Sequence, residues 1–353
     1  MSEWVRSLWW FAIGLVVFLV ICAALPVAEQ AAADPNIENF SDAIWYGVVT
    51  LTTVGYGDYF PKSLLGRLLG AVFVLGSLGM LGLLIGEIGE AIAAYRERQR
   101  LGHHGFEGSG HLFVVGWHGL IEDVVEQLRE FERPIVVVTD EKADVDQIHE
   151  RYGDEEVFPL YAGYSDMETL AHGKPAEAFR IYVGLRDDTE TLVTLLNLQR
   201  EFPDQDFVVS VEKDRLRRTF RGAGVNHAVS TDRVTAGIVA SLIFEPDVAE
   251  FTRDLITADT TDSEGYDIQQ YWIADGHDLV GRDYGEAFEE LVREHEVVPV
   301  GLRKDDESHV RPLPDDDVGI EAGDYLLVVT PERREPFLEE EYFGVTHGLR
   351  VDD

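Results

Sequence analysis

The stretch that decides the fold is Leu51-Thr52-Thr53-Val54-Gly55-Tyr56-Gly57-Asp58. A row of carbonyl oxygens on one side of an extended chain requires backbone angles of alternating hand. Gly55 and Gly57 can supply positive φ angles without a Cβ penalty. The hydroxyl of Thr53 adds one more oxygen at the inner end of the row. The stretch therefore predicts a short row of carbonyl and hydroxyl oxygen atoms.

The residues on both sides place this stretch between two membrane spans. Residues 8–28 carry no charge, residues 68–85 form a second apolar run, and each run can cross a bilayer as a helix. A signal peptide is the alternative interpretation of the first run, but the acidic Glu3 beside Arg6 and the second span argue against it. Residues 45–50 form a short apolar segment suited to a helix that leads into the stretch.

The segment Thr53–Gly57 resembles the selectivity filter of potassium channels, in which main-chain carbonyls replace the water around the ion. The resemblance implies that potassium ions are held by the carbonyls of Thr53, Val54, Gly55 and Tyr56. It also implies a homotetramer, because one chain supplies only a quarter of each oxygen ring. Trp45 and Asp58 match a pair that forms a hydrogen bond behind such filters. A Gly- and Thr-rich turn is the alternative, and the two flanking spans disfavour it.

Composition limits the classes of protein that remain. The 353 residues carry 66 acidic side chains against 29 Lys and Arg, a formal net charge of −37. This excess disfavours nucleic-acid binding, and the hydrophobic content of 45% argues against disorder. An acidic surface with few lysines suits high salt, so we expect a halophilic source. The single cysteine, Cys22, lies in the first apolar run and predicts neither a disulfide nor a thiolate metal site.

Positive charges predict the orientation in the membrane. Arg6 precedes the first span, and Arg96, Arg98 and Arg100 follow the second. By the positive-inside rule both termini lie in the cytoplasm and the filter faces outward. We therefore expect a multi-pass protein of the plasma membrane.

The second span is rich in glycine, which permits close helix packing and helix bending. Packing alone would account for most of these glycines. The hinge of the inner helix in two-helix potassium channels falls near Ser77, so Gly76 and Gly79 are the candidate hinge residues. Glu87 and Glu90 follow at the inner end. Four copies would form two acidic rings that concentrate cations, although solvated interfacial residues are the alternative.

The chain after the spans reads as a soluble α/β region. A polar, glycine-rich linker at residues 99–110 separates a pore domain at residues 1–98 from alternating strand and helix patterns at residues 111–246. This alternation predicts a doubly wound parallel sheet of the Rossmann type. Residues 247–264 connect it to a smaller α+β lobe at residues 265–345.

The first turn of the sheet carries part of a dinucleotide fingerprint. Gly116 occupies the first glycine position and Asp140 the acidic position after the second strand. His118 and Ile121 occupy the other two glycine positions, and a bulky side chain there would keep the backbone away from a pyrophosphate. A structural turn and an adenine-nucleotide site are equally supported. A charged His118 beside Gly119 could instead hold an anion at the helix N-terminus.

The order of these parts resembles two-helix potassium channels with a cytoplasmic regulator-of-potassium-conductance (RCK) domain, made of a TrkA-N-like and a TrkA-C-like lobe. The resemblance rests on the filter, the Rossmann unit, Tyr161-Ala-Gly-Tyr-Ser-Asp166 and Glu321-Ala-Gly-Asp-Tyr-Leu-Leu-Val. It implies paired lobes in a gating ring, which additional RCK domains would complete to an octamer. It also makes Asp166 a candidate nucleotide contact.

Calcium-gated members of this family hold the ion on an Asp after the fourth strand and a Glu-x-Glu after the fifth. These places read Gly184 and Ser210-Val211-Glu212 here, so only Glu212 remains as a candidate metal ligand. A hard divalent cation needs several oxygen ligands, which puts the calcium site in doubt.

We therefore expect a potassium-selective, tetrameric channel that is gated by a ligand on its RCK ring. The alternatives are a membrane-anchored nucleotide sensor, or a regulatory subunit of potassium uptake, with a non-conducting pore. The sequence offers no catalytic constellation, so we do not expect an enzyme. His103, His104 and His111 are expected to be exposed around the linker. The gating ligand, an adenine nucleotide or a divalent cation among others, stays open.

Overall fold

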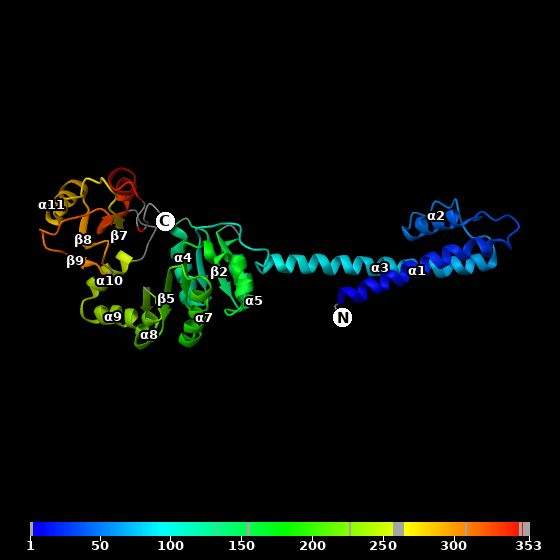
Figure 1. Cartoon of the computed structure of the whole chain (residues 1–353), viewed down its shortest axis with the longest axis horizontal. Helices are drawn as coiled ribbons and strands as arrows, with labels where there is room; N and C mark the ends of the chain where they lie inside the picture. The colour runs from blue at the N-terminus through cyan, green and yellow to red at the C-terminus, as the bar shows by residue number, and fades with distance from the viewer. Residues whose placement is uncertain are drawn as a thin grey trace. The chain divides into compact units, whose positions relative to one another are not determined.

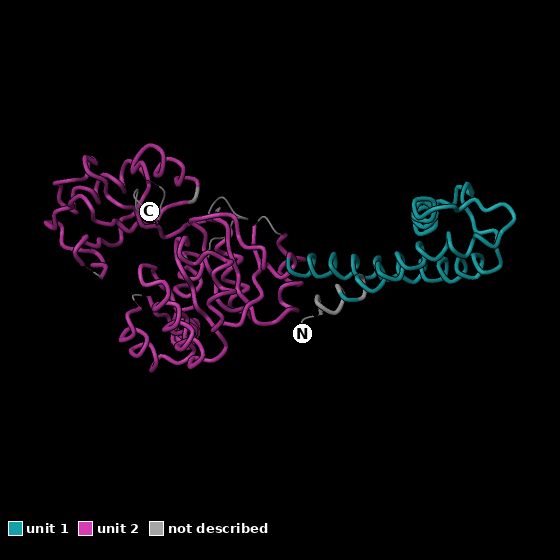
Figure 2. Tube along the Cα trace, turned by 45° about the vertical axis from the view of Figure 1, so that its right-hand side comes forward, with its two compact units in different colours: residues 1–98 teal, residues 99–353 magenta. Residues whose placement is uncertain are grey.

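The computed structural model describes residues 3–131, 133–153, 156–225, 227–256, 265–307, 309–345 and 348. The chain divides into two compact units, residues 1–98 and residues 99–353, coloured separately in Figure 2. Figure 1 labels many of the elements by the names used here.

The first unit contains three helices, α1 (Glu3–Glu29), α2 (Phe40–Leu51) and α3 (Leu64–Arg100). Ala12–Glu29 and α3 are long and apolar enough to cross a membrane. The short helix α2 begins earlier than the sequence predicted, because the side chain of Asn39 caps it by accepting a hydrogen bond of 3.0 Å from the amide of Asp42.

Close packing explains part of the glycine content of this unit. On α3 the buried positions recur every three or four residues and form one stripe of Gly66, Gly70, Phe73 and Ser77. On α2, a Cβ at Gly47 would lie 2.9 Å from the ring of Phe18 and 3.1 Å from the sulfur of Cys22. Glycine at position 47 therefore lets α2 approach α1.

The second unit begins with the predicted parallel sheet. Its six strands are β1 (Leu112–Val115), β2 (Ile135–Thr139), β3 (Val157–Tyr161), β4 (Arg180–Val183), β5 (Phe207–Val211) and β6 (His227–Ser230). They lie in the order β3-β2-β1-β4-β5-β6. The strand order reverses between β1 and β4, which is where open α/β sheets bind ligands at the carboxyl ends of their strands. The Rossmann prediction is confirmed.

Helices pack on both faces of this sheet, and the central strands β1 and β2 are therefore almost wholly apolar and buried. The helices are α4 (Gly119–Leu128), α5 (Lys142–Tyr152), α6 (Met167–Leu170), α7 (Asp188–Glu201) and α8 (Arg217–Gly222). Phe113 of β1 packs with Leu195 of α7, whereas its neighbour Val114 packs with Ile121 of α4 and Ile148 of α5. Successive strand residues thus face opposite layers, as the pleat requires.

Two helices, α9 (Thr231–Phe244) and α10 (Pro246–Ile256), lead to the smaller lobe. Its antiparallel sheet has the order β7-β10-β8-β9. The strands are β7 (Tyr266–Trp272), β8 (Val298–Arg303), β9 (Arg311–Pro312) and β10 (Tyr325–Pro331). Helix α11 (Tyr284–Glu290) passes into a π-helical turn at Leu291–His295, and α12 (Glu335–Phe337) follows the sheet. The α+β prediction for this lobe is confirmed.

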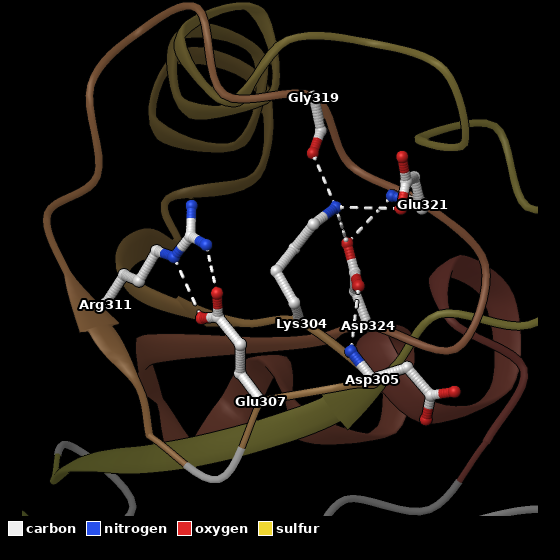
Figure 3. Close-up of polar contacts among 7 residues, drawn as sticks. All are labelled: Lys304, Asp305, Glu307, Arg311, Gly319, Glu321 and Asp324. Carbon is white, nitrogen blue, oxygen red and sulfur yellow. Dashed lines mark hydrogen bonds and ion pairs between the residues drawn. The ribbon is translucent and has the colours of Figure 1, made fainter.

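An ion pair between Lys304 and the buried Asp324 holds the loop before β10 (Figure 3). The carboxylate of Asp324 is 1% exposed and accepts hydrogen bonds from Lys304 Nζ at 2.8 Å and from the amides of Glu321 and Asp305 at 2.8 and 3.2 Å. Lys304 Nζ also donates to the carbonyl of Gly319 at 2.9 Å. Burial by itself would lower the pKa of Lys304, but the bond and charge of Asp324 outweigh it and hold that pKa above its usual value.

We expect Lys304→Met to destabilise the smaller lobe by about 3 kcal/mol, because the carboxylate of Asp324 would stay buried without its counter-ion. Hydrogen exchange of the β8 and β10 amides in the full-length protein would measure the loss. Arg311→Met is the matched control, since the Arg311–Glu307 pair in the same lobe lies at the surface and should matter far less. Equal losses in the two variants would contradict a role for the buried pair.

Candidate functional site

The filter stretch has the alternating backbone that the sequence predicted. Thr53, Gly55 and Gly57 have φ angles of 56°, 60° and 75°. The positive φ of Thr53 was not predicted, and it is an uncommon conformation for a β-branched residue. The stretch is anchored on the last turn of α2, because the amides of Val54 and Gly55 both donate to the carbonyl of Val49, at 3.0 and 3.2 Å.

Side chains hold the outer end of the same stretch. Nε1 of Trp45 on α2 donates to a carboxylate oxygen of Asp58 at 2.7 Å, and the ring of Trp45 stacks on Tyr56 with centroids 6.2 Å apart. Nδ2 of Asn36, in the loop between α1 and α2, donates to the carbonyl of Asp58 at 3.2 Å. These contacts support the filter on the side of α2.

Glu29 is a buried residue of this unit that the sequence analysis missed. Its carboxylate accepts hydrogen bonds from the amides of Lys62 and Ser63, both at 2.9 Å, and from the hydroxyl of Ser63 at 2.8 Å. The Ser63 oxygen in turn accepts from the amide of Gly66 at 2.9 Å. Glu29 and Ser63 together satisfy free N–H groups at the start of α3. A carboxylate at the end of an apolar span, where charge is costly, was the available signal.

We expect Glu29→Gln to weaken the attachment of α3 to α1 by about 2 kcal/mol, because hydrogen bonds to a charged acceptor are replaced by bonds to a neutral amide. Thermal unfolding of the detergent-solubilised protein would measure the difference. Asp34→Asn, which removes the charge of the exposed partner of the Lys62 ammonium, is the control. If the Glu29→Gln variant is as stable as the control variant, Glu29 does not hold α3 on α1.

The phase of α3 distinguishes its candidate residues. Continued from the buried stripe at about 100° per residue, the helix places Gly82 and Gly86 on the opposite face. Glu90 falls beside that face, whereas Glu87 falls nearer the buried stripe. A Cβ at Gly76 or Gly79 would have no neighbour within 4 Å. The single chain therefore shows no packing reason for glycine at either candidate hinge.

The Rossmann turn is closed by a contact between glycines. Gly116 has φ of 114°, and a Cβ there would lie 2.2 Å from the carbonyl oxygen of Gly184. The fully buried Ile121 reaches across to Gly184, where a Cβ would lie 2.7 Å from its Cδ1 atom. The close approach of helix and strand that the third fingerprint glycine normally permits is thus achieved by Gly184, directly after the neighbouring strand β4.

The surroundings of His118 disfavour the positive charge that the anion role would need. Burial lowers its pKa, opposed by a hydrogen bond to the backbone of Gly184, and the nearby Arg186 guanidinium lowers the pKa further. The imidazole is therefore neutral near pH 7. Gly119 and Leu120, which start α4, are exposed. Arg186, also exposed, is the positive side chain at this turn.

The two acidic candidates lie after the carboxyl ends of β2 and β3, an edge of the sheet that we call the crevice. Both are exposed, but they have different partners. Asp140 follows β2 and is exposed. Burial raises the pKa of the neighbouring Tyr164 hydroxyl, and the charge of Asp140 and a hydrogen bond to it raise that pKa further. Asp166 accepts from the amide and hydroxyl of Thr169, at 3.2 and 2.7 Å, and so caps α6. The geometry leaves Asp140 as the acid better placed for a ribose.

The family's calcium position is filled by neutral groups in this chain. The hydroxyl of Tyr182 donates to Ser210 Oγ at 2.9 Å, and a Cβ at Gly184 would meet both side chains within 3.0 Å. Glu212 is exposed, and its amide donates to the buried carboxylate of Asp188 at 2.8 Å. Within the described part of the chain, no three His, Cys, Asp or Glu side chains form a group able to hold a metal ion.

The histidines around the linker differ from expectation. His111 is fully buried, with Phe106 4.6 Å from its ring centroid, and burial lowers its pKa. His103 is half-buried and bonds to the main chain of β3. Exposure was therefore the wrong prediction for both residues, because the linker packs on the sheet instead of crossing solvent.

Comparisons with known proteins match the two units of the chain to two different families. Residues 5–94 match the ion channel family model, and residues 112–231 match the TrkA-N domain model. The chain is 22% identical over 311 residues to the calcium-gated potassium channel TvoK of Thermoplasma volcanium, covering 85% of this chain and 84% of that protein. It is 39% identical over 77 residues to a voltage-gated potassium channel of Aeropyrum pernix, covering 21% of this chain and 26% of that protein.

Among solved structures, the human SLO3 gating ring aligns with a TM-score of 0.51 at 11% identity, which shows a shared fold. The alignment covers 66% of this chain, and this chain spans 46% of that one. The matches define the class, an ion-channel pore domain joined to a TrkA-N domain. The predicted resemblance to two-helix potassium channels with an RCK domain is confirmed.

Proposed function

We propose that the protein is a potassium-selective channel, assembled as a homotetramer and gated by a ligand on its RCK domains. The observation that carries the proposal is the alternating backbone of Thr53, Gly55 and Gly57, held on α2 between two membrane-spanning helices. Carbonyls arranged in this way replace the hydration shell of potassium when four copies surround one axis. Both termini lie in the cytoplasm of a plasma-membrane protein, by the charge of the flanking arginines.

Reconstitution in planar bilayers tests this function. We expect single-channel currents that reverse near the potassium equilibrium potential under mixed potassium and sodium gradients, and a native mass that contains four copies of the chain. Equal passage of sodium would contradict the filter, and a monomer in lipid would contradict the assembly. A protein that binds ligand but never conducts would support the alternative, a membrane-anchored sensor or regulatory subunit.

The assembly proposal is supported by an apolar surface on α9 and α10. None of the residues of α9 is buried, and its last two residues, Ile243 and Phe244, are 70% and 84% exposed. Val248 and Phe251 continue this surface on α10. The same unit contains an apolar cavity of about 850 Å³ lined by Leu120 and Val124 among others. Pairing of regulatory lobes would cover these surfaces, and a native mass above four copies would indicate the additional RCK domains of an octameric ring.

We propose Glu90 as the main acidic ring at the inner mouth, because the phase of α3 brings it closer than Glu87 to the face opposite α1. Glu90→Gln should lower the single-channel potassium conductance more than the matched variant Glu87→Gln. The difference should shrink as ionic strength rises, since salt screens the attraction of cations. Equal conductances in both variants at low salt would contradict this assignment.

For the gating ligand we favour an adenine nucleotide over a divalent cation. The exposed start of α4, Asp140 and Arg186 offer amides, a ribose acceptor and a positive charge around one crevice. The family's calcium position carries Tyr182 and Ser210 instead of carboxylates. Calorimetry with ADP should detect binding that Asp140→Asn weakens, whereas binding of calcium and not of ADP would reverse the preference.

A further inference from the structure

The linker covers the free edge of the sheet in the second unit. β3 is an edge strand, with β2 on one side only. On its other side, the amide of Tyr161 donates to the carbonyl of Leu101 at 3.0 Å. Gly102, with φ of 75°, lies so close to the carbonyl of Pro159 that a Cβ would approach it to 2.4 Å. Proline at an edge position offers no N–H to a foreign strand, so the linker is the partner of this edge.

Side chains complete the attachment at the end of α3. Nε2 of His103 lies 2.8 Å from the carbonyl oxygen of Tyr161 and donates to it. Tyr161 thus has both of its main-chain groups bonded to the linker. On α5, His149 Nε2 donates to the carbonyl of Arg100 at 2.8 Å, and Asp146 forms an ion pair with the Arg100 guanidinium. Leu101 between these contacts is only 4% exposed.

The rest of the linker makes separate contacts further along. The amide of Phe106 donates to the carbonyl of His172, and the amide of Gly110 donates to the carbonyl of Glu177, both at 2.8 Å. Two anchored segments, residues 100–103 and residues 106–110, therefore flank a short connection at His104 and Gly105. The first anchored segment reaches the sheet without help from the second.

We propose that residues 100–103 form a latch that joins the end of α3 directly to β3 and α5, so that conformational force passes through Tyr161 to α3 and bypasses residues 104–110. Tyr161 also begins the segment that ends at Asp166 beside the crevice. The ammonium of Lys142 lies 5.5 Å from the ring centroid of Tyr161. Tyr161 thus both contacts the latch and begins the segment that leads to the crevice. As a device for gating, this inference rests on the proposed function.

The test separates the latch from the covalent connection. Three glycines inserted between His104 and Gly105 lengthen the connection. They break the bond from the Gly105 amide to the Gly102 carbonyl, but they keep every residue that bonds either segment to the sheet or to α5. His103→Ala with Asp146→Ala opens the latch, and His103→Gln restores an N–H donor at similar reach. His227→Ala, an exposed histidine on β6, is the control. Each variant is studied as the full-length protein, by hydrogen exchange of the peptides around Tyr161 and Leu101 and by nucleotide-free single-channel recording.

We expect His103→Ala to speed exchange at the Tyr161 amide by about five-fold, the effect of one hydrogen bond, and His103→Gln to restore the slow rate. The insertion alone should leave the open probability close to wild type. The insertion combined with the open latch should change the open probability by at least about five-fold. Neither the latch nor residues 104–110 can then transmit force to α3. An insertion that by itself has the full effect, or exchange that no variant changes, would overturn the latch.

ADP calorimetry on the wild-type protein keeps the two proposals distinguishable. If ADP does not bind, the nucleotide site fails, while the nucleotide-free recordings still decide the latch. If the wild-type protein does not conduct, the proposed channel function fails, and the exchange rates of the His103 variants still decide whether residues 100–103 are held on β3.

Discussion

The alternating backbone of the filter stretch is the constraint on which the rest of the first unit depends. Carbonyls can face one axis only if alternate residues adopt positive φ, and a chain so strained needs external support. Here the support comes from the last turn of α2, through the carbonyl of Val49, and from the Trp45–Asp58 bond at the outer end. Gly47 allows α2 to approach α1, so this glycine helps to position the filter stretch.

A very acidic chain uses its buried carboxylates in one recurrent way. Glu29, Asp188 and Asp324 are all buried among the described residues, and each accepts hydrogen bonds from consecutive or neighbouring main-chain amides. Charged acceptors make stronger bonds to N–H groups than neutral ones, which offsets the cost of burying them. In each unit such a carboxylate fixes the start of a helix or the turn next to a strand. The other acids in the described ranges are half-buried or exposed, where salt screens their repulsion.

In the Rossmann lobe, the residue that replaces a fingerprint glycine determines which residue fits at the family's calcium position. Ile121 stands where the fingerprint has glycine, and Gly184 stands where calcium-gated relatives of the resembled family have a carboxylate. These two residues are in contact, so the helix–strand approach leaves no space for an Asp side chain at position 184. Tyr182 and Ser210 then satisfy each other at the neighbouring position. The departure from the calcium pattern is thus a packing solution that involves several residues together.

Local patterns allowed much of the molecule to be predicted. The filter motif, two apolar runs and the alternation of strands with helices predicted the pore domain, the parallel sheet and the α+β lobe, because backbone geometry and hydrophobic periodicity are local properties. The roles of Glu29, Asp324 and the linker histidines depend on partners about 19 to 58 residues away, for which one sequence carries no periodic signal. The sequence around His103 predicts a polar residue in a flexible linker. Its hydrogen-bond acceptor, the carbonyl of Tyr161, is found only because the linker runs along β3. The sequence by itself determined which elements form, and the tertiary structure decided which side chains hold them together, since that choice depends on distances between elements.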